Sequence, residues 1–132
     1  MRGYIKKLLR ENLNDFLIVY RGQGEYENLS PSNSIWVSRD YNFAKEYGKV
    51  MVFKLPKALN ILDSEINYSI WENLIDEYEI LTGGGGDYDE YKYEPNEDFI
   101  NFLTSKGYHG FENGDNILIF NKQNLTTDST VT

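Results

Sequence analysis

The sequence predicts an α+β fold, a single domain with a split antiparallel β-sheet core and short flanking helices. A chain of 132 residues is long enough for one hydrophobic core and too short for two independent ones. The apolar runs typical of strands are short, and small helical segments separate them without the regular alternation of a βαβ fold. No repeat occurs at the period of a solenoid or a propeller.

The first half of the chain predicts a helix followed by strands that surround a second, shorter helix. Residues 1–14 place apolar side chains at helical spacing and predict an amphipathic helix packed on the domain, with a membrane or partner role as the less favoured alternative. Asp40 is a suitable N-cap for a two-turn helix that Gly48 ends. The polar stretch 22–33 predicts a loop. Strands are predicted at residues 15–20, 34–38 and 50–55.

Helical spacing returns in the middle of the chain. A helix is predicted over residues 65–81, with an inward face made of Ile66, Ile70, Leu74, Ile75 and Tyr78. Four consecutive glycines then interrupt the pattern, because each of them adds conformational freedom that folding must remove. Residues 82–95 predict a mobile loop rich in glycine, tyrosine and acidic residues.

The C-terminal part predicts a helix and a hairpin. The helix begins after Asn96 and ends before Gly107. The dipeptide Asn113-Gly114 is typical of a tight turn, so the segments before and after it are expected to pair antiparallel. The domain is predicted to span residues 15–125, and the polar residues 126–132 form a disordered tail.

Composition excludes several classes of function. The chain has 13 basic and 21 acidic residues, so its net charge of −8 makes nucleic acid an unfavourable partner. It has no cysteine and a single histidine, His109, which is expected to be structural, so neither a thiolate nucleophile nor a metal site is predicted. No apolar stretch is long enough to cross a bilayer, and no signal peptide is seen, which predicts no membrane partner and a cytoplasmic protein.

The segment Tyr20-Arg21-Gly22-Gln23 is the strongest functional signal, since it directly follows an apolar strand. Arg21 would leave this strand at a cleft, where its guanidinium can clamp phosphate or ribose. Gly22 would let a ligand approach the backbone. The sequence therefore predicts a nucleotide pocket at the end of the first strand.

This segment, together with Trp36-Val37-Ser38 and the pattern Ala44-x-x-Tyr47, resembles the ADP-ribosyltransferase fold. The resemblance continues through Gly107 to Phe111 and Asp115 to Asn121, which are similar to the family's closing hairpin. It implies an NAD-dependent mono-ADP-ribosyltransferase of the small phage or bacterial effector type. Such a protein would use NAD as a substrate and no metal, and would modify a macromolecular target, expected to be a host protein in the host cytoplasm.

The resemblance also implies the roles of individual residues. In the family the closing strand usually begins with a glutamate that holds the nicotinamide ribose, and this chain has Asn116 at the matching position. The catalytic candidates are Arg21, Ser38, Glu112 and Asp115, the two acids being expected to face each other across the hairpin. The candidates for binding NAD are Tyr20, Arg21, Gly22, Gln23, Trp36, Ser38, Tyr47 and Asn116.

Each candidate also has a purely structural interpretation, and two other functions stay open. Arg21 can be a surface residue at a strand end, and Trp36 can be a core residue. Glu112 and Asp115 can be solvated acids that flank the turn. A catalytically degenerate member of the fold, binding a nucleotide or a protein, is the first alternative, and Asn116 favours it. The second is an acidic interaction protein whose residues 87–98 block a basic host partner.

Overall fold

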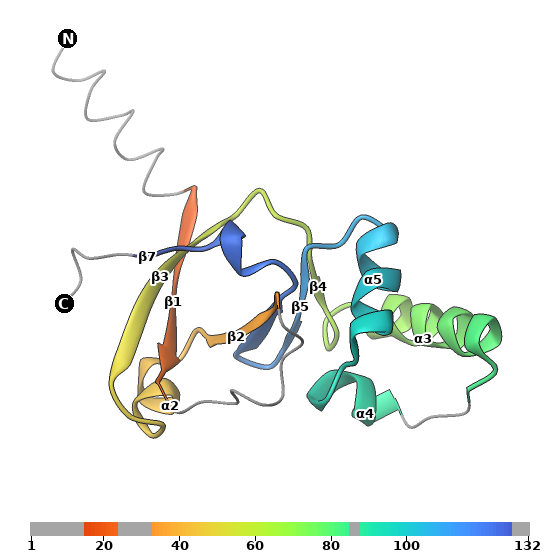
Figure 1. Cartoon of the computed structure of the whole chain (residues 1–132), viewed down its shortest axis with the longest axis horizontal. Helices are drawn as coiled ribbons and strands as arrows, with labels where there is room; N and C mark the ends of the chain where they lie inside the picture. The colour runs from red at the N-terminus through yellow and green to blue at the C-terminus, as the bar shows by residue number, and fades with distance from the viewer. Residues whose placement is uncertain (1–14, 24–32, 85–87, 128–132) are drawn as a thin grey trace, which may run out of the picture.

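The computed structural model describes residues 15–23, 33–84 and 88–127, which form a single α+β domain around a seven-stranded sheet (Figure 1). The helix predicted over residues 1–14 lies outside the described residues. The strands are β1 (Phe16–Gly22), β2 (Ile35–Ser38), β3 (Val50–Pro56), β4 (Ile61–Asp63), β5 (Gly110–Asn113), β6 (Asn116–Ile119) and β7 (Thr126–Thr127). The helices are α2 (Tyr41–Lys45), α3 (Tyr68–Thr82), α4 (Tyr88–Tyr93), α5 (Glu97–Ser105) and the short 3₁₀ helix η1 (Lys122–Asn124).

The sheet has the strand order β4-β5-β6-β2-β1-β3-β7, and every neighbouring pair except β4 and β5 is antiparallel. β1 pairs with β3 along its whole length, whereas the pair Tyr20 and Ser38 joins β1 to β2. Beyond this pair the two strands diverge, as Figure 1 shows. The α+β class and the mostly antiparallel sheet predicted from the sequence are confirmed.

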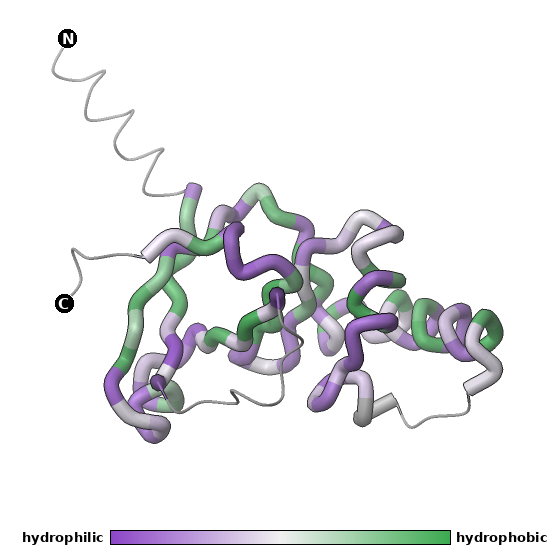
Figure 2. Tube along the Cα trace, in the orientation of Figure 1, coloured by the Kyte–Doolittle hydropathy of each residue, from purple (hydrophilic) through white to green (hydrophobic). Residues whose placement is uncertain are grey.

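Two apolar clusters form the core, one on each face of the central strands. On the first face Trp36, Phe111 and Leu118 pack against α3 and α5, and Trp71 of α3 is fully buried there. On the second face Val19 and Phe53 of β1 and β3 meet Val37, Ile117 and Ile119 of β2 and β6. Residues alternate between the two clusters along β2 and β6, as the two-residue period of a strand requires, whereas β1 and β3 contribute to the second cluster. Figure 2 shows hydrophobic residues along β1, β3 and α3.

Helix α2 lies at the end of β1, away from the helices α3, α4 and α5 that gather near β4 and β5 (Figure 1). Asp40 is its N-cap, as predicted, since its side chain accepts a hydrogen bond from the amide of Asn42 at 2.9 Å. The C-terminal turn of α2 packs directly on Gly22. A Cβ at Gly22 would lie 2.2 Å from the carbonyl oxygen of Ala44, so only glycine fits.

Two predictions in the middle of the chain are wrong in part. α3 begins at Tyr68, and Ile66 and Ile70 are 82% and 44% exposed instead of pointing inward. Trp71 takes the inward position, because it lies at i, with Leu74, Ile75 and Tyr78 at i+3, i+4 and i+7 on the buried face of the helix. The segment predicted as a mobile loop over residues 82–95 contains α4, and Tyr91 packs on Phe99 with ring centroids 4.7 Å apart.

Three strand features also differ from the prediction. β4 was not expected, and it lies parallel to β5 because α3, α4 and α5 form a crossover between the two strands. Part of the tail predicted as disordered forms β7, which pairs with Phe53 and Lys54 of β3. The hairpin turn is Gly114-Asp115, one residue later than expected, so Asn113 pairs with Asn116.

Substituting Gly22 with alanine is expected to destabilise the domain. The new methyl group would meet backbone atoms of α2, which cannot move aside without shifting the whole helix. We expect Gly22→Ala to lower the free energy of unfolding by about 1 to 3 kcal/mol, measured by urea denaturation.

Gly84→Ala is the matched control, since a Cβ there has its nearest neighbour, the Thr82 hydroxyl, at 3.4 Å. It should leave the urea midpoint nearly unchanged. Equal stability of the Gly22→Ala variant and the unmodified protein would contradict the close contact between β1 and α2.

Candidate functional site

The joint between β1 and β2 aligns polar side chains in one row across four strands. Tyr20 pairs with Ser38, Ser38 pairs with Asn116, and Asn116 pairs with Asn113. Residues that pair directly across neighbouring strands have side chains on the same face. These residues therefore share the first face of the sheet, at the edge of the cluster that contains Trp36 and Leu118. Three of the predicted site residues, Tyr20, Ser38 and Asn116, are brought together in this way.

A pocket of about 230 Å³ opens at the end of this row, and we call it the hairpin pocket. Asn113, Asp115 and Asn116 of the β5–β6 hairpin line one part of it. Asp40 and Phe43 of α2 and Tyr93 of α4 line the rest. Two carboxylates, two aromatic rings and two amides thus face a shared space, with no lysine or arginine among its described lining residues.

Ser38 and Asn116 occupy polar positions inside the fold. Ser38 is fully buried, and its hydroxyl accepts a hydrogen bond from the amide of Asp40 at 3.0 Å. This bond positions the start of α2 beside the pocket. The Oδ1 atom of Asn116 is buried and has no hydrogen-bond partner in the part of the chain that the structure describes. An acceptor of this kind at the edge of a pocket is suited to a donor group on a ligand.

The Tyr20-Arg21-Gly22-Gln23 segment has a structural role that the sequence did not predict. Arg21 is half-buried, and its Nη1 donates to the carbonyl oxygen of Trp36 at 2.8 Å, which ties β1 to β2 just beyond the Tyr20–Ser38 pair. What approaches the backbone at Gly22 is α2. Gln23 is exposed, and its amide donates to the carbonyl of Lys49.

The two predicted stacking residues lie in different surroundings. Trp36 is 6% exposed and packs edge-on against Phe111 at a centroid distance of 5.7 Å, so its ring belongs to the core. Tyr47 is half-buried and packs against Phe43, with ring centroids 5.3 Å apart. Phe43 is therefore the ring that reaches the hairpin pocket, supported from behind by Tyr47.

Glu112 lies on the opposite face from the hairpin pocket, which corrects the prediction that it faces Asp115. Because the turn comes one residue later than expected, Glu112 pairs with Ile117 of the second apolar cluster. Its Oε1 accepts from the Nε of Arg39 at 2.5 Å, with the side chains of Arg39 and Glu112 44% and 11% exposed. Asp63 lies beside it, since the two residues are partners in the parallel β4–β5 pair.

The carboxyl groups of Glu112 and Asp63 are driven toward different protonation states. Burial and the neighbouring Asp63 raise the pKa of Glu112 above its usual value, although Arg39 acts against them. Burial also acts to raise the pKa of Asp63, but the amides of Ile66 and Glu65, hydrogen bonding with Glu112 and the charge of Arg39 together lower it. On acidification Glu112 therefore takes a proton first.

Sequence reasoning missed Arg39, Asp63, Phe43 and Tyr93. Arg39 follows the Trp36-Val37-Ser38 segment but was given no role, and only the register of β4 beside β5 brings Asp63 to Glu112. Phe43 was given no role in the sequence analysis, and Tyr93 was assigned to a mobile loop. A signal was available for Phe43, since it lies one helical turn before Tyr47 and the two rings were bound to be neighbours.

Across residues 15–23, 33–84 and 88–127, no group of three histidine, cysteine or acidic side chains is placed to hold a metal ion. Within the same ranges, no helix combines the length and the apolar character that crossing a bilayer requires.

Replacing Arg39 with methionine tests the ionic cluster. Methionine keeps an apolar stem beside Leu17 and Leu59 but removes the cation that stabilises the charged form of Glu112. We expect a loss of roughly 1 to 2 kcal/mol at neutral pH, between the values for exposed and buried ion pairs. The loss should shrink as the pH falls through the raised pKa of Glu112, because a protonated carboxyl no longer needs the cation.

Lys106→Met is the control, since it removes the 2.5 Å ion pair with Glu77, in which both side chains are more than a third exposed. Its cost should stay below about 1 kcal/mol. Denaturation at several pH values measures both variants. A cost for Arg39→Met that grows on acidification would show that Glu112 is not its ionic partner.

Comparisons with known proteins give no match to this chain. No family model, no curated protein and no solved structure shows significant similarity to it. A functional assignment therefore depends on the residues of the hairpin pocket and their geometry.

Proposed function

We propose that this protein is ADP-ribosyltransferase-like and binds NAD with the nicotinamide end in the hairpin pocket. The observation that carries the proposal is the row of Tyr20, Ser38 and Asn116, which β1, β2 and β6 align so that its member Asn116 lines that pocket. These strands come from the two ends of the chain, and the sequence resemblance assigned NAD contacts to all three residues.

The chemistry of the pocket suits the nicotinamide end of NAD. The nicotinamide ring is flat and positively charged, and Phe43 and Tyr93 offer aromatic surfaces to it. Asp40 and Asp115 supply negative charge in the same space. The carboxamide group can donate a hydrogen bond to the buried Oδ1 of Asn116, which has no partner in the described structure.

Transfer of ADP-ribose requires stabilisation of a positive charge. As the bond between the ribose C1′ and the nicotinamide nitrogen breaks, the electron pair leaves with nicotinamide and the ribose becomes cation-like. A nucleophile of the target protein then bonds to C1′ and loses its proton. Asp115 is the carboxylate for this role, because it lines the pocket, whereas Glu112 lies on the other face and pairs with Arg39.

A second candidate function is NAD or nucleotide binding without transfer. The uncharged Asn116 at the position of the family's glutamate favours it. Asp115 is also exposed and has a shorter side chain than glutamate, so its charge is better screened by water. Binding and cleavage of NAD must therefore be measured separately.

NAD binding is tested by titration, with the fluorescence of Trp36 as a reporter close to Ser38 on β2 and isothermal calorimetry as a direct measurement. We expect saturable binding, weakened about tenfold in Tyr93→Ala because an aromatic wall is lost. Tyr93 is 61% exposed, so this substitution should leave the fold intact.

The control is Tyr68→Ala, which removes a 47% exposed tyrosine that does not line the pocket, and it should bind NAD like the unmodified protein. If the unmodified protein does not bind NAD, the proposed transferase fails, and the second candidate function fails as far as it concerns NAD. If Tyr68→Ala weakens binding as much as Tyr93→Ala, the nucleotide is bound elsewhere.

Asp115→Asn separates transfer from binding. It removes one negative charge and keeps the shape of the side chain, while the backbone carbonyl of Asp115 can still accept from the amide of Arg39. We expect nicotinamide release, measured with labelled NAD and cell lysate, to fall at least about tenfold while NAD affinity changes little.

Asp98→Asn makes the same change on the exposed first turn of α5 and should release nicotinamide at the unmodified rate. Full activity of Asp115→Asn would remove Asp115 from the mechanism. NAD binding by the unmodified protein with neither nicotinamide release nor label transfer would establish the second candidate function.

A further inference from the structure

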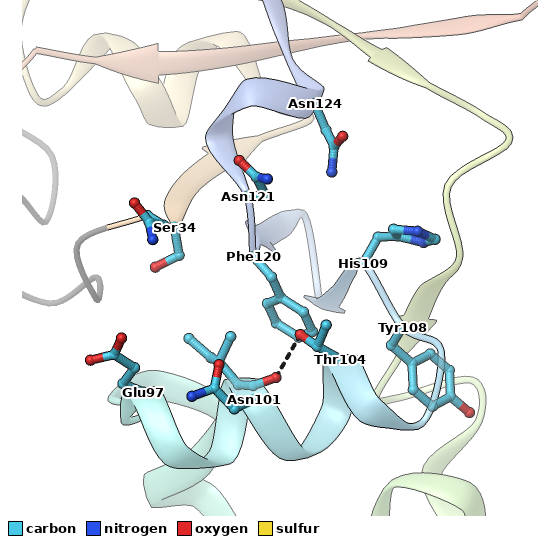
Figure 3. A pocket seen from close by; sticks show the side chains of 11 residues that line it. Ser34, Glu97, Asn101, Thr104, Tyr108, His109, Phe120, Asn121 and Asn124 are labelled. Atoms are coloured by element: carbon cyan, nitrogen blue, oxygen red, sulfur yellow. Dashed lines mark hydrogen bonds between the residues drawn. The ribbon is translucent and has the colours of Figure 1, made fainter.

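A second cavity, of about 430 Å³, lies at the opposite end of β2 and β6 from the hairpin pocket. We call it the α5 cavity, because Glu97, Asn101 and Thr104 of α5 form one of its walls (Figure 3). Ser34, which precedes β2, and Asn121, which follows β6, lie on the other side. A volume of this size is within the range of small-molecule sites. The proposed NAD site does not use it.

The lining of the α5 cavity is polar and almost uncharged. It contains four asparagine side chains together with serine, threonine and tyrosine hydroxyls. Glu97 is the one charged side chain among the described lining residues, and no lysine or arginine is present there. In a protein with a net charge of −8, such a site disfavours anionic ligands such as phosphates. The lining therefore favours a neutral ligand with many hydrogen-bonding groups.

The internal hydrogen bonds determine which polar atoms face the cavity as donors and which as acceptors. The Oδ1 of Asn121 accepts from the amide of Gln123, which directs the Nδ2 donor of Asn121 elsewhere. Thr104 donates its hydroxyl proton to the carbonyl of Ile100 at 2.8 Å, so its oxygen remains an acceptor. The lining thus offers a donor on Asn121 and an acceptor on Thr104, which matches hydroxyl groups because each hydroxyl both donates and accepts.

An apolar surface lies between the two polar walls. Figure 3 shows the ring of Phe120 between Asn121 and Asn124 on one side and Thr104 and Asn101 on the other. Phe120 is 7% exposed and is held edge-on by Phe111, so it presents a limited apolar patch and not a slot between two flat faces. Such a patch suits the C–H groups of a saturated ring better than a stacked heterocyclic base.

The walls are fixed by backbone hydrogen bonds before any ligand binds. The amide of Lys122 donates to the carbonyl of Asn33 at 2.8 Å, which links η1 to the segment before β2. Asn124 donates to the carbonyl of Asn121, and Asn96 caps α5 by accepting from the amide of Phe99. A preformed site loses less conformational entropy on binding.

We propose that the α5 cavity is a binding site for a neutral polyhydroxylated ring, that is, a sugar. Vicinal hydroxyls would bond to the amides of Asn101 and Asn121 and to Thr104, and the C–H face would contact Phe120. A sugar of this chemistry can come from a glycan or from the ribose of a nucleoside. The experiment below tests these two sources in separate titrations.

The single histidine of the chain provides a specific reporter. His109 lines the α5 cavity, and its Nδ1 accepts from the amide of Asn60 at 3.0 Å, which places the ring proton on Nε2 in the neutral form. Its imidazole signals in a proton NMR spectrum therefore have no overlap with a second histidine. The full chain is titrated with neutral monosaccharides, disaccharides and N-acetylated sugars in one arm, and with ribose and adenosine in the other. We expect saturable shifts of the His109 signals in one arm at millimolar concentrations.

Asn121→Asp is the decisive variant. A carboxylate still caps η1 by accepting from Gln123, but it removes the Nδ2 donor and adds a negative charge to the cavity that Glu97 also lines. We expect the affinity for the sugar to fall about tenfold or more. Asn73→Asp makes the same change on an exposed position of α3 outside the cavity, and its affinity should equal that of the unmodified protein.

Three outcomes would overturn the sugar site. The His109 signals stay unchanged throughout both arms, or they shift without saturating, or Asn121→Asp binds as tightly as Asn73→Asp. NAD titration is read separately in the same spectra. A sugar site that fails leaves the hairpin pocket untouched, and sugar binding without NAD binding would reject only the proposed NAD site.

Discussion

The joint between β1 and β2 is the constraint on which the rest of the structure depends. The two halves of the sheet are joined at the Tyr20–Ser38 pair, and the bond from Arg21 Nη1 to the carbonyl of Trp36 reinforces them one step further on. The missing side chain of Gly22 then lets α2 pack against the end of β1. Because the halves diverge beyond this point, Val19 and Phe53 can pack against Val37 and Ile117 in one cluster. The joint therefore creates both the core of one face and the polar row of the other.

Strand alternation then separates the polar groups into two sets with different physical roles. Ser38 and Asn116 lie on the face that leads to the hairpin pocket, while Glu112 and its partner Arg39 lie among the apolar residues of the other face. A turn placed one residue earlier would have paired Glu112 with Asp115 instead of Ile117, since a slip of one residue in register changes every cross-strand pair. The position of Gly114 in a left-handed conformation, with φ of 63°, fixes this choice.

The sequence predicts the elements well where local signals are strong and less well where distant segments meet. The Asp40 and Asn96 caps, the strands β1 to β3 and the hairpin follow from cap residues, apolar runs and turn chemistry. The three-residue β4 has no local signal, because its pairing with β5 is determined only once α3 and α5 have packed. For the candidate site, the sequence indicated Tyr20, Ser38 and Asn116, which the sheet aligns in one row. The position of Glu112 next to Asp63 depends on a strand register that no local pattern specifies.

The unpaired Oδ1 of Asn116 distinguishes the hairpin pocket from an ordinary strand end. Leaving a buried acceptor without a partner costs about 1 to 3 kcal/mol, and an apolar side chain would avoid this cost, as Leu118 does two residues later on the same face. The indole nitrogen of Trp71 also has no partner among the described residues, but its ring buries a large apolar surface that offsets the cost. Asn116 has no such compensation in the described structure. A donor group in the hairpin pocket would supply the missing partner of this acceptor.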